Sequence, residues 1–182
     1  MCLPNGKDYF CVSVRSWEHL AQDFEDSVAN ACRYVYEKHR LIPVFIPMQQ
    51  SRDGAICKRI KEKTGSYAEL VRGNIPYEKI ASIISNSRFV IGMRLHILIY
   101  SACAGVPAIG LDYDPKVKHM MDYMGQCHSL PVETLSAKDL CALCDEVIKN
   151  REQLTEKLAE IRENSRIAAE ENSDIAIKLL KA

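Results

Sequence analysis

Hydrophobic residues occur in short runs that alternate with longer segments in which they recur every three or four positions. Short apolar and β-branched runs bounded by turn residues indicate buried strands, and the longer spacing indicates amphipathic helices. We predict strands over residues 8–15, 42–47, 67–71, 88–91 and 106–111, with a sixth over 127–132. We predict helices over 23–39 and 53–63, from 76 onward, over 94–104 and 115–124, and through most of 136–182.

This alternation predicts an α/β fold, a doubly wound parallel sheet of about five or six strands with helices on both faces. We expect residues 9–135 to form this domain and to carry the ligand crevice. Residues 1–8 are polar and are predicted to be a leader. Residues 136–182 are predicted to be helices that pack on the domain or on a missing N-terminal domain, with Ser136 as the N-cap.

Charged side chains follow the predicted strands at the points where the strands end. Because the carboxyl ends of parallel strands share one edge, and ligands bind at that edge, we expect these side chains to face one crevice. A helix that begins directly after a strand also offers free N–H groups that favour an anion. The candidates are Arg15 after the first strand, Arg94 and His96 after the fourth, and Asp112, Asp114 and Lys116 after the fifth.

Each of these residues also has a structural explanation. An arginine at a helix start can pair with a neighbouring carboxylate, and a histidine beside an apolar run can be a hydrogen-bonded core residue. The pair Asp114-Pro115 can simply cap a helix. These explanations account for single residues better than for their clustering at one edge.

The overall charge gives no partner, because the 182 residues contain 24 basic and 24 acidic side chains. We therefore expect no nucleic acid partner, and any anion must be bound locally. No apolar run reaches the roughly 20 residues that span a bilayer, so we expect no transmembrane segment. We expect a cytoplasmic protein, with a peripheral position at the membrane face as an option.

The eight cysteines are scattered through predicted strands and helices, where free thiols pack as small hydrophobic groups. Cys141 and Cys144 have the C-x-x-C form but lack a second pair at zinc spacing, so we expect no metal. The sequence has no G-x-G-x-x-G, P-loop, H-E-x-x-H or G-x-S-x-G motif. A phosphate group would therefore be held by side chains.

Three segments carry a resemblance to a known family. They are residues 90–100 (VIGMRLHILIY), 105–107 (GVP) and 113–117 (YDPKV), and together they resemble the signature of the polysaccharide pyruvyl transferase family, in particular its cell-wall, CsaB-like branch. Residues 13–17 (SVRSW), and 46–49 (IPMQ) with Asp53, also resemble that family. The resemblance covers roughly residues 9–125. These enzymes are similar to two-domain GT-B glycosyltransferases, and the chain corresponds to their carboxyl-terminal half.

The resemblance implies transfer of pyruvate from phosphoenolpyruvate to two hydroxyls of a polysaccharide or lipid-linked sugar, which forms a ketal and releases phosphate. No cofactor is implied. The residues that the resemblance places on phosphoenolpyruvate are Arg15, Arg94, Leu95 and His96. The chemistry adds candidate roles: His96 as phosphate ligand or acid, Asp112 or Asp114 as base or cation stabiliser, and Lys116 as a partner of the departing phosphate.

The sequence is also compatible with two other functions. One is a GT-B glycosyltransferase half that binds a sugar nucleotide in the same crevice, and the other is a non-catalytic module that binds a phospho-ligand. The acceptor sugar is expected to be presented by the missing half, so the chain can be inactive by itself. The sequence does not separate a natural half from an excised domain.

Overall fold

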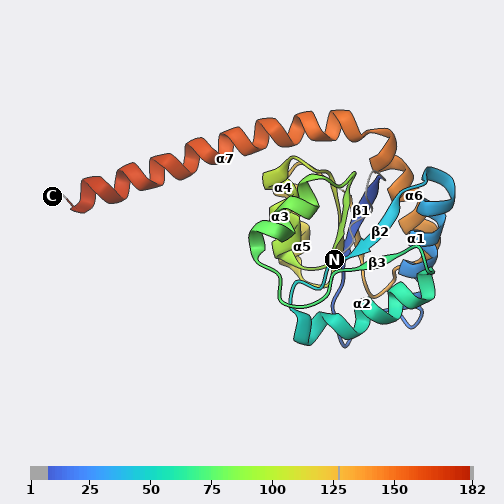
Figure 1. Cartoon of the computed structure of the whole chain (residues 1–182). Helices are drawn as coiled ribbons and strands as arrows, with labels where there is room; N and C mark the ends of the chain where they lie inside the picture. The colour runs from blue at the N-terminus through green and yellow to red at the C-terminus, as the bar shows by residue number, and fades with distance from the viewer. Residues whose placement is uncertain (1–7, 127, 181–182) are drawn as a thin grey trace.

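The computed structural model describes residues 8–126 and 128–180. Residues 1–7 of the predicted leader lie outside the described residues. Its centre is one sheet of six parallel strands in the order β3-β2-β1-β4-β5-β6 (Figure 1). The predicted parallel α/β fold is therefore confirmed. The strands are β1 (Tyr9–Ser13), β2 (Ile42–Phe45), β3 (Glu69–Leu70), β4 (Val90–Gly92), β5 (Ala108–Asp112) and β6 (Ser129–Pro131).

The helices lie close to their predicted positions. They are α1 (Phe24–His39), α2 (Gln50–Thr64), α3 (Tyr77–Ser85), α4 (Leu95–Ala104), α5 (Pro115–Tyr123), α6 (Ala137–Lys149) and α7 (Arg151–Leu180). The predicted C-terminal helix is divided at Asn150, the C-cap of α6, whose N–H donates a hydrogen bond to the Glu146 carbonyl. Ser136 is the N-cap of α6, as predicted, because its hydroxyl accepts a hydrogen bond from the Asp139 N–H.

The third strand is shorter than its predicted range. Only Glu69 and Leu70 pair with β2, at Val44 and Phe45, and this strand forms one edge of the sheet. The Tyr67 ring instead stacks on the Tyr36 ring, with centroids 3.7 Å apart. The ring contact and the edge position explain why the apolar pattern there overestimates the strand.

Two hydrophobic cores cover the two faces of the sheet. The first is formed with α1, α2 and α6 and contains Phe10, Phe45 and Phe89. The second is formed with α3, α4 and α5 and contains Ile97 and Met121. Figure 1 shows these two groups of helices on opposite sides of the strands, whereas most of α7 runs past the body of the domain.

The C-x-x-C segment belongs to the first core. Cys144 is fully buried there, and burial raises the pKa of its thiol well above the ordinary value. No group of three or more potential metal-binding side chains is found in the described part of the chain. Within the same residues, no helix is both long and apolar enough to cross a membrane.

Candidate functional site

Arg15 and Arg94 lie at the carboxyl edge of the sheet, beyond two strands that are direct neighbours. The parallel register of β1 and β4 pairs Ser13 with Gly92, so each arginine follows its strand by two residues. β1 and β4 are thus direct neighbours in the sheet. Their side chains, however, make different contacts.

Arg94 forms a buried ion pair that crosses the edge. Its Nη2 lies 2.5 Å from Oδ1 of Asp53, and its Nε lies 3.0 Å from Oδ2. The Arg94 side chain is 15% exposed and the Asp53 side chain is 0% exposed. An ion pair with a neighbouring carboxylate was the structural explanation given for Arg94, and Asp53 is that carboxylate. Asp53 belongs to α2, which packs on the other face of the sheet from α4. The planar fork of the guanidinium is therefore held in one orientation.

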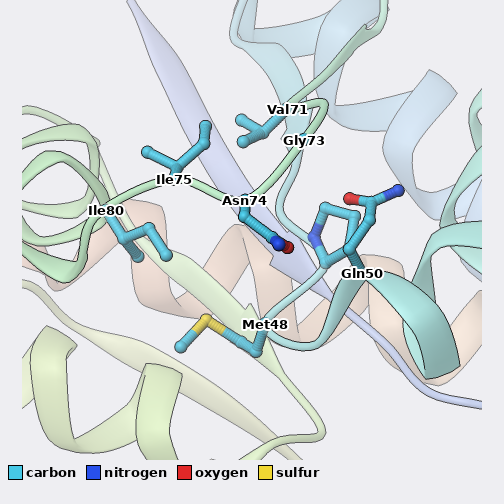
Figure 2. Close-up of a pocket in the computed structure, with 8 residues that line it drawn as sticks. Met48, Gln50, Val71, Gly73, Asn74, Ile75 and Ile80 are labelled. Carbon is cyan, nitrogen blue, oxygen red and sulfur yellow. The ribbon is translucent and has the colours of Figure 1, made fainter.

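Arg94 and His96 line a pocket of about 360 Å³ at this edge. His96 is exposed and Leu95 is partly buried, and Tyr77 and Tyr100 also line this pocket. A second pocket of about 260 Å³ adjoins the first, because both are lined by Met48, Ile75 and Ile80. Figure 2 shows this second pocket, with Asn74 directed between Met48 and Gln50. We call the two adjoining pockets the edge crevice.

Three helices begin at the edge crevice. Gln50 is the first residue of α2, Tyr77 is the first residue of α3, and His96 is the second residue of α4, and all three line the crevice. Helix starts present N–H groups and a partial positive charge. Among the residues that the structure describes, no aspartate or glutamate lines either pocket. The electrostatics of the edge crevice therefore favour an anion.

Arg15 is held by aromatic rings. Its guanidinium carbon lies 5.3 Å from the centre of the Trp17 ring and 5.1 Å from the centre of the Tyr113 ring. Nη1 donates a long hydrogen bond of 3.3 Å to the Tyr113 hydroxyl, whereas the buried Nε has no hydrogen-bond partner. Among the described residues, no carboxylate forms an ion pair with Arg15. After the backbone N–H and side chain of Lys116, the charge of Arg15 also contributes to the lowered pKa of Asp114, but the guanidinium is not held by any carboxylate that the structure describes.

Asp114 and Lys116 meet beside Tyr113. Asp114 caps α5, as the structural alternative predicts, by accepting a hydrogen bond from the Lys116 N–H at 3.0 Å. It also pairs with the Lys116 ammonium at 3.0 Å. The backbone N–H and then the side chain of Lys116 lower the pKa of Asp114. The Lys116 Nζ lies 5.6 Å from the Tyr113 ring centre, so Arg15 and Lys116 both contact this ring.

The pKa of Asp112 is shifted in the opposite direction to that of Asp114. It lies at the end of β5 and lines a third pocket, of about 470 Å³, with Ser129, Lys118 and Glu133. Burial raises the pKa of Asp112, against a hydrogen bond from Ser129 that lowers it. Its Oδ1 is buried and has no hydrogen-bond partner. Asp112 is therefore the better proton acceptor of the two aspartates.

The predicted site residues thus form two groups at one edge. Arg94, Leu95 and His96 belong to the edge crevice, whereas Arg15, Asp112, Asp114 and Lys116 gather around and beyond Tyr113. Sequence reasoning did not assign roles to Asp53, Trp17 or Tyr113. Asp53 could have been found because it belongs to one of the segments that resemble the family. Its pairing with Arg94 could not, because the two residues are 41 positions apart and no local spacing connects them.

Buried polar atoms without partners are concentrated at the same edge. Such atoms are rare in folded proteins and often mark positions where a ligand or water completes the hydrogen bonding. Among the residues described, the edge supplies Ser13 Oγ, Arg15 Nε, Gln50 Oε1 and Asp112 Oδ1. They lie at the end of β1, the start of α2 and the end of β5.

Similar solved structures define the class of fold. UDP-GlcNAc 2-epimerase from Neisseria meningitidis bound to UDP-GlcNAc is 13% identical, with a TM-score of 0.66 over 99% of this chain and 46% of that chain. S. aureus MnaA with UDP is 13% identical, with a TM-score of 0.65 over 86% and 41%. Os79 from O. sativa in complex with UDP is 8% identical, with a TM-score of 0.61 over 86% and 36%. The fold is that of one domain of GT-B-type enzymes, and the chain spans less than half the length of these structures.

The sequence identifies the family. The family model for polysaccharide pyruvyl transferase matches residues 3–115, which is more than half of the chain. No curated protein matches the sequence. The chain belongs to the polysaccharide pyruvyl transferase family, as the sequence signature predicted.

Proposed function

We propose that this chain is the phosphoenolpyruvate-binding half of a pyruvyl transferase that acts on a polysaccharide or lipid-linked sugar. The observation that carries the proposal is the acid-free edge crevice, in which Arg94 and His96 stand among three helix starts. Phosphoenolpyruvate brings a phosphate and a carboxylate, and both groups suit N–H donors and a guanidinium fork. Family membership supports the reaction class.

The proposed chemistry takes place at C2 of phosphoenolpyruvate. The oxygen of one sugar hydroxyl bonds to C2 and gives up its proton to the base, while C3 gains a proton and becomes a methyl group. The C2–O bond to phosphate then breaks, phosphate leaves with the electron pair, and a cation remains at C2. The second hydroxyl adds to C2 and loses its proton, which closes the ketal. Neither metal nor cofactor is required by this sequence of steps.

The side chains divide these tasks in the proposal. Arg94, the amides at Leu95 and His96, and the charge of Arg15 hold the two anionic groups. His96 protonates or holds the departing phosphate, and Lys116 neutralises it. Of the two aspartates considered, Asp112 is the base, because Asp114 is engaged by α5 and Lys116. Asp114 then keeps Lys116 in place beside Tyr113.

A second candidate is a sugar-nucleotide enzyme of the GT-B type. The observation that favours it is that the similar solved structures named above contain UDP or UDP-GlcNAc. Because the sequence identities are low, this likeness establishes the fold alone. The third reading, a non-catalytic phospho-ligand module, remains compatible with a chain that spans less than half of those structures.

The deciding experiment compares the two donors directly. Calorimetry and thermal shift with phosphoenolpyruvate and with UDP are expected to show binding of phosphoenolpyruvate only. Phosphate release with a sugar acceptor, measured with and without a separately supplied amino-terminal half, then separates an enzyme from a binding module. Binding of UDP in preference to phosphoenolpyruvate would replace this proposal by the second candidate. We place the reaction in the cytoplasm, at the membrane face when the acceptor is lipid-linked.

A further inference from the structure

Asp53 is completely buried and does not line the edge crevice, yet its hydrogen bonds go to two residues that do. Its Oδ2 accepts hydrogen bonds from the Gln49 N–H at 2.9 Å and from Arg94 Nε at 3.0 Å. Its Oδ1 accepts a hydrogen bond from Arg94 Nη2 at 2.5 Å. Gln49 and Arg94 both line the pocket that contains His96. The carboxylate therefore lies directly behind the crevice wall.

These bonds connect two helix starts that lie on opposite faces of the sheet. Asp53 lies in α2, which follows β2 and packs in the first core. Arg94 precedes α4, which follows β4 and packs in the second core. Since β1 lies between β2 and β4, the ion pair crosses the carboxyl end of β1. It ties the starts of two helices on opposite faces of the sheet.

The pairing determines what Arg94 offers to a ligand. The bonds to Asp53 use Nε and Nη2, and Nη2 also lies 3.5 Å from the Gln49 side-chain oxygen. This leaves Nη1 for an anion. The negative charge of Asp53 largely offsets the positive charge of Arg94. The pair therefore contributes mainly an N–H donor with a fixed direction to ligand binding, and little net charge.

We propose that Asp53 is a positioning residue for the anion site: it holds the Arg94 guanidinium and the Gln49 amide so that Nη1 of Arg94 faces the ligand. The identity of the anion as phosphoenolpyruvate rests on the proposed function. Asp53 touches no reactant in this account and acts through Arg94. The competing explanation is that the pair only joins α2 to α4.

Asp53→Asn tests the proposal with little change in shape. The amide NH₂ must replace one carboxylate oxygen, so it faces either Arg94 Nη2 or both Arg94 Nε and the Gln49 N–H, donor against donor. The Arg94 fork is expected to turn away. The matched control is Glu25→Gln, because Arg59 also donates Nε and Nη2 to Glu25, at 2.9 and 2.6 Å, outside the crevice.

Two measurements give separate answers. In NMR spectra, the Arg94 Nε–H signal, assigned with Arg94→Lys, is expected to be protected from exchange in the wild type and in Glu25→Gln but not in Asp53→Asn. In calorimetry, Asp53→Asn is expected to bind phosphoenolpyruvate about tenfold or more weakly, the scale of one charge-assisted hydrogen bond. Glu25→Gln is expected to bind as the wild type does.

A double-mutant cycle separates positioning from a general loss of structure. In the Arg94→Gln background, adding Asp53→Asn is expected to cause no further loss of affinity, because Asp53 acts through Arg94. If Asp53→Asn is too unstable to purify, Asp53→Glu takes its place, since it keeps the charge but displaces the carboxylate by one methylene. The same loss of affinity is expected there.

Three results would overturn the proposal. They are unchanged affinity in a folded Asp53→Asn or Asp53→Glu variant, additive losses in the cycle, and loss of the Nε–H signal without loss of affinity. A wild type that shows the protected Nε–H signal but does not bind phosphoenolpyruvate instead overturns the proposed function. The pair would then be a structural link only, which removes the positioning role as well.

Discussion

Arg15 and Arg94 follow neighbouring parallel strands at equal distances, but their environments are opposite. Arg94 is bound by a fully buried carboxylate that fixes its direction and offsets its charge. Arg15 lies against the rings of Trp17 and Tyr113, which also contact each other, and it forms no ion pair among the described residues; its buried Nε has no partner. An ion pair fixes the direction of a guanidinium and offsets its charge, whereas contact with aromatic rings stabilises a guanidinium without offsetting its charge.

This difference suggests a division of work at the anion site. Arg94 provides a donor that is already oriented before the ligand arrives, so little side-chain freedom is lost on binding. Under the proposed function, Arg15 is expected to provide most of the net attraction for the anion. Variants at this edge, with controls elsewhere in the fold, test this division.

The largest effect is expected from Asp53→Ala, measured as the free energy of unfolding in urea. Removing one member of a buried ion pair leaves the other charge uncompensated and costs about 3–5 kcal/mol. Glu25→Ala breaks the bidentate pair with Arg59, whose side chain is 51% exposed, and should cost about 1 kcal/mol or less. Equal losses in the two variants would show that the Arg94 pair behaves as a surface pair.

The second effect concerns affinity instead of stability. Arg15→Ala should weaken phosphoenolpyruvate binding by about 1.5–3 kcal/mol, roughly 10- to 100-fold, with little change in the unfolding free energy, because no ion pair is broken. Arg94→Ala should lower both quantities. Cys141→Ala, remote from the edge, is the control for binding, and calorimetry with urea titration gives both numbers. Unchanged affinity in Arg15→Ala would remove Arg15 from the site.

The third prediction concerns how the stability of the fold depends on pH, at a residue that lies outside the edge crevice. Burial alone would raise the pKa of Asp145, but hydrogen bonds from Lys38, His39 and Tyr34 outweigh it and lower the pKa to about 2. The folded-state pKa is thus below the ordinary 3.8, so the stabilisation is present above pH 3.8 and is lost as the pH falls through about 2.

Asp145→Asn should therefore be less stable than the wild type at neutral pH, by about 1–2 kcal/mol once solvent screening is considered. The difference should disappear near pH 2, as followed by urea unfolding at several pH values. Phosphoenolpyruvate affinity at neutral pH should not change, because Asp145 joins α6 to α1 and lies outside both pockets of the edge crevice. A stability difference that persists at pH 2 would contradict the assignment.

The smallest effect is expected in the aromatic cage of Arg15. Tyr113→Leu removes one ring face and should weaken phosphoenolpyruvate binding by about 0.5–1 kcal/mol, the range for a partly exposed cation–π contact. Tyr113→Phe keeps the ring and removes only the acceptor of a 3.3 Å hydrogen bond, so it should bind almost as the wild type does. An equal loss in Tyr113→Phe and Tyr113→Leu would assign the effect to the hydroxyl, which both variants lack.

Much of this molecule follows from local patterns. Short apolar runs and helical spacing predicted the strand and helix order because each pattern reflects which faces are buried. The caps at Ser136 and Asp114 were predictable because a cap needs only residues within one turn. The placement of Arg15 and Arg94 at one edge followed from the direction of parallel strands, and their signature segments identified the family.

The tertiary structure alone decided the partners of those residues. The pairing of Arg94 with Asp53 spans 41 positions, and the contact of Arg15 with Tyr113 spans 98, so no spacing rule connects either pair. Both depend on the strand order, which places β1 between β2 and β4, and β4 between β1 and β5. The sequence determined which chemical groups reach the edge, because that is local; folding determined which charge is cancelled and which is kept, because that depends on contacts made across the sheet.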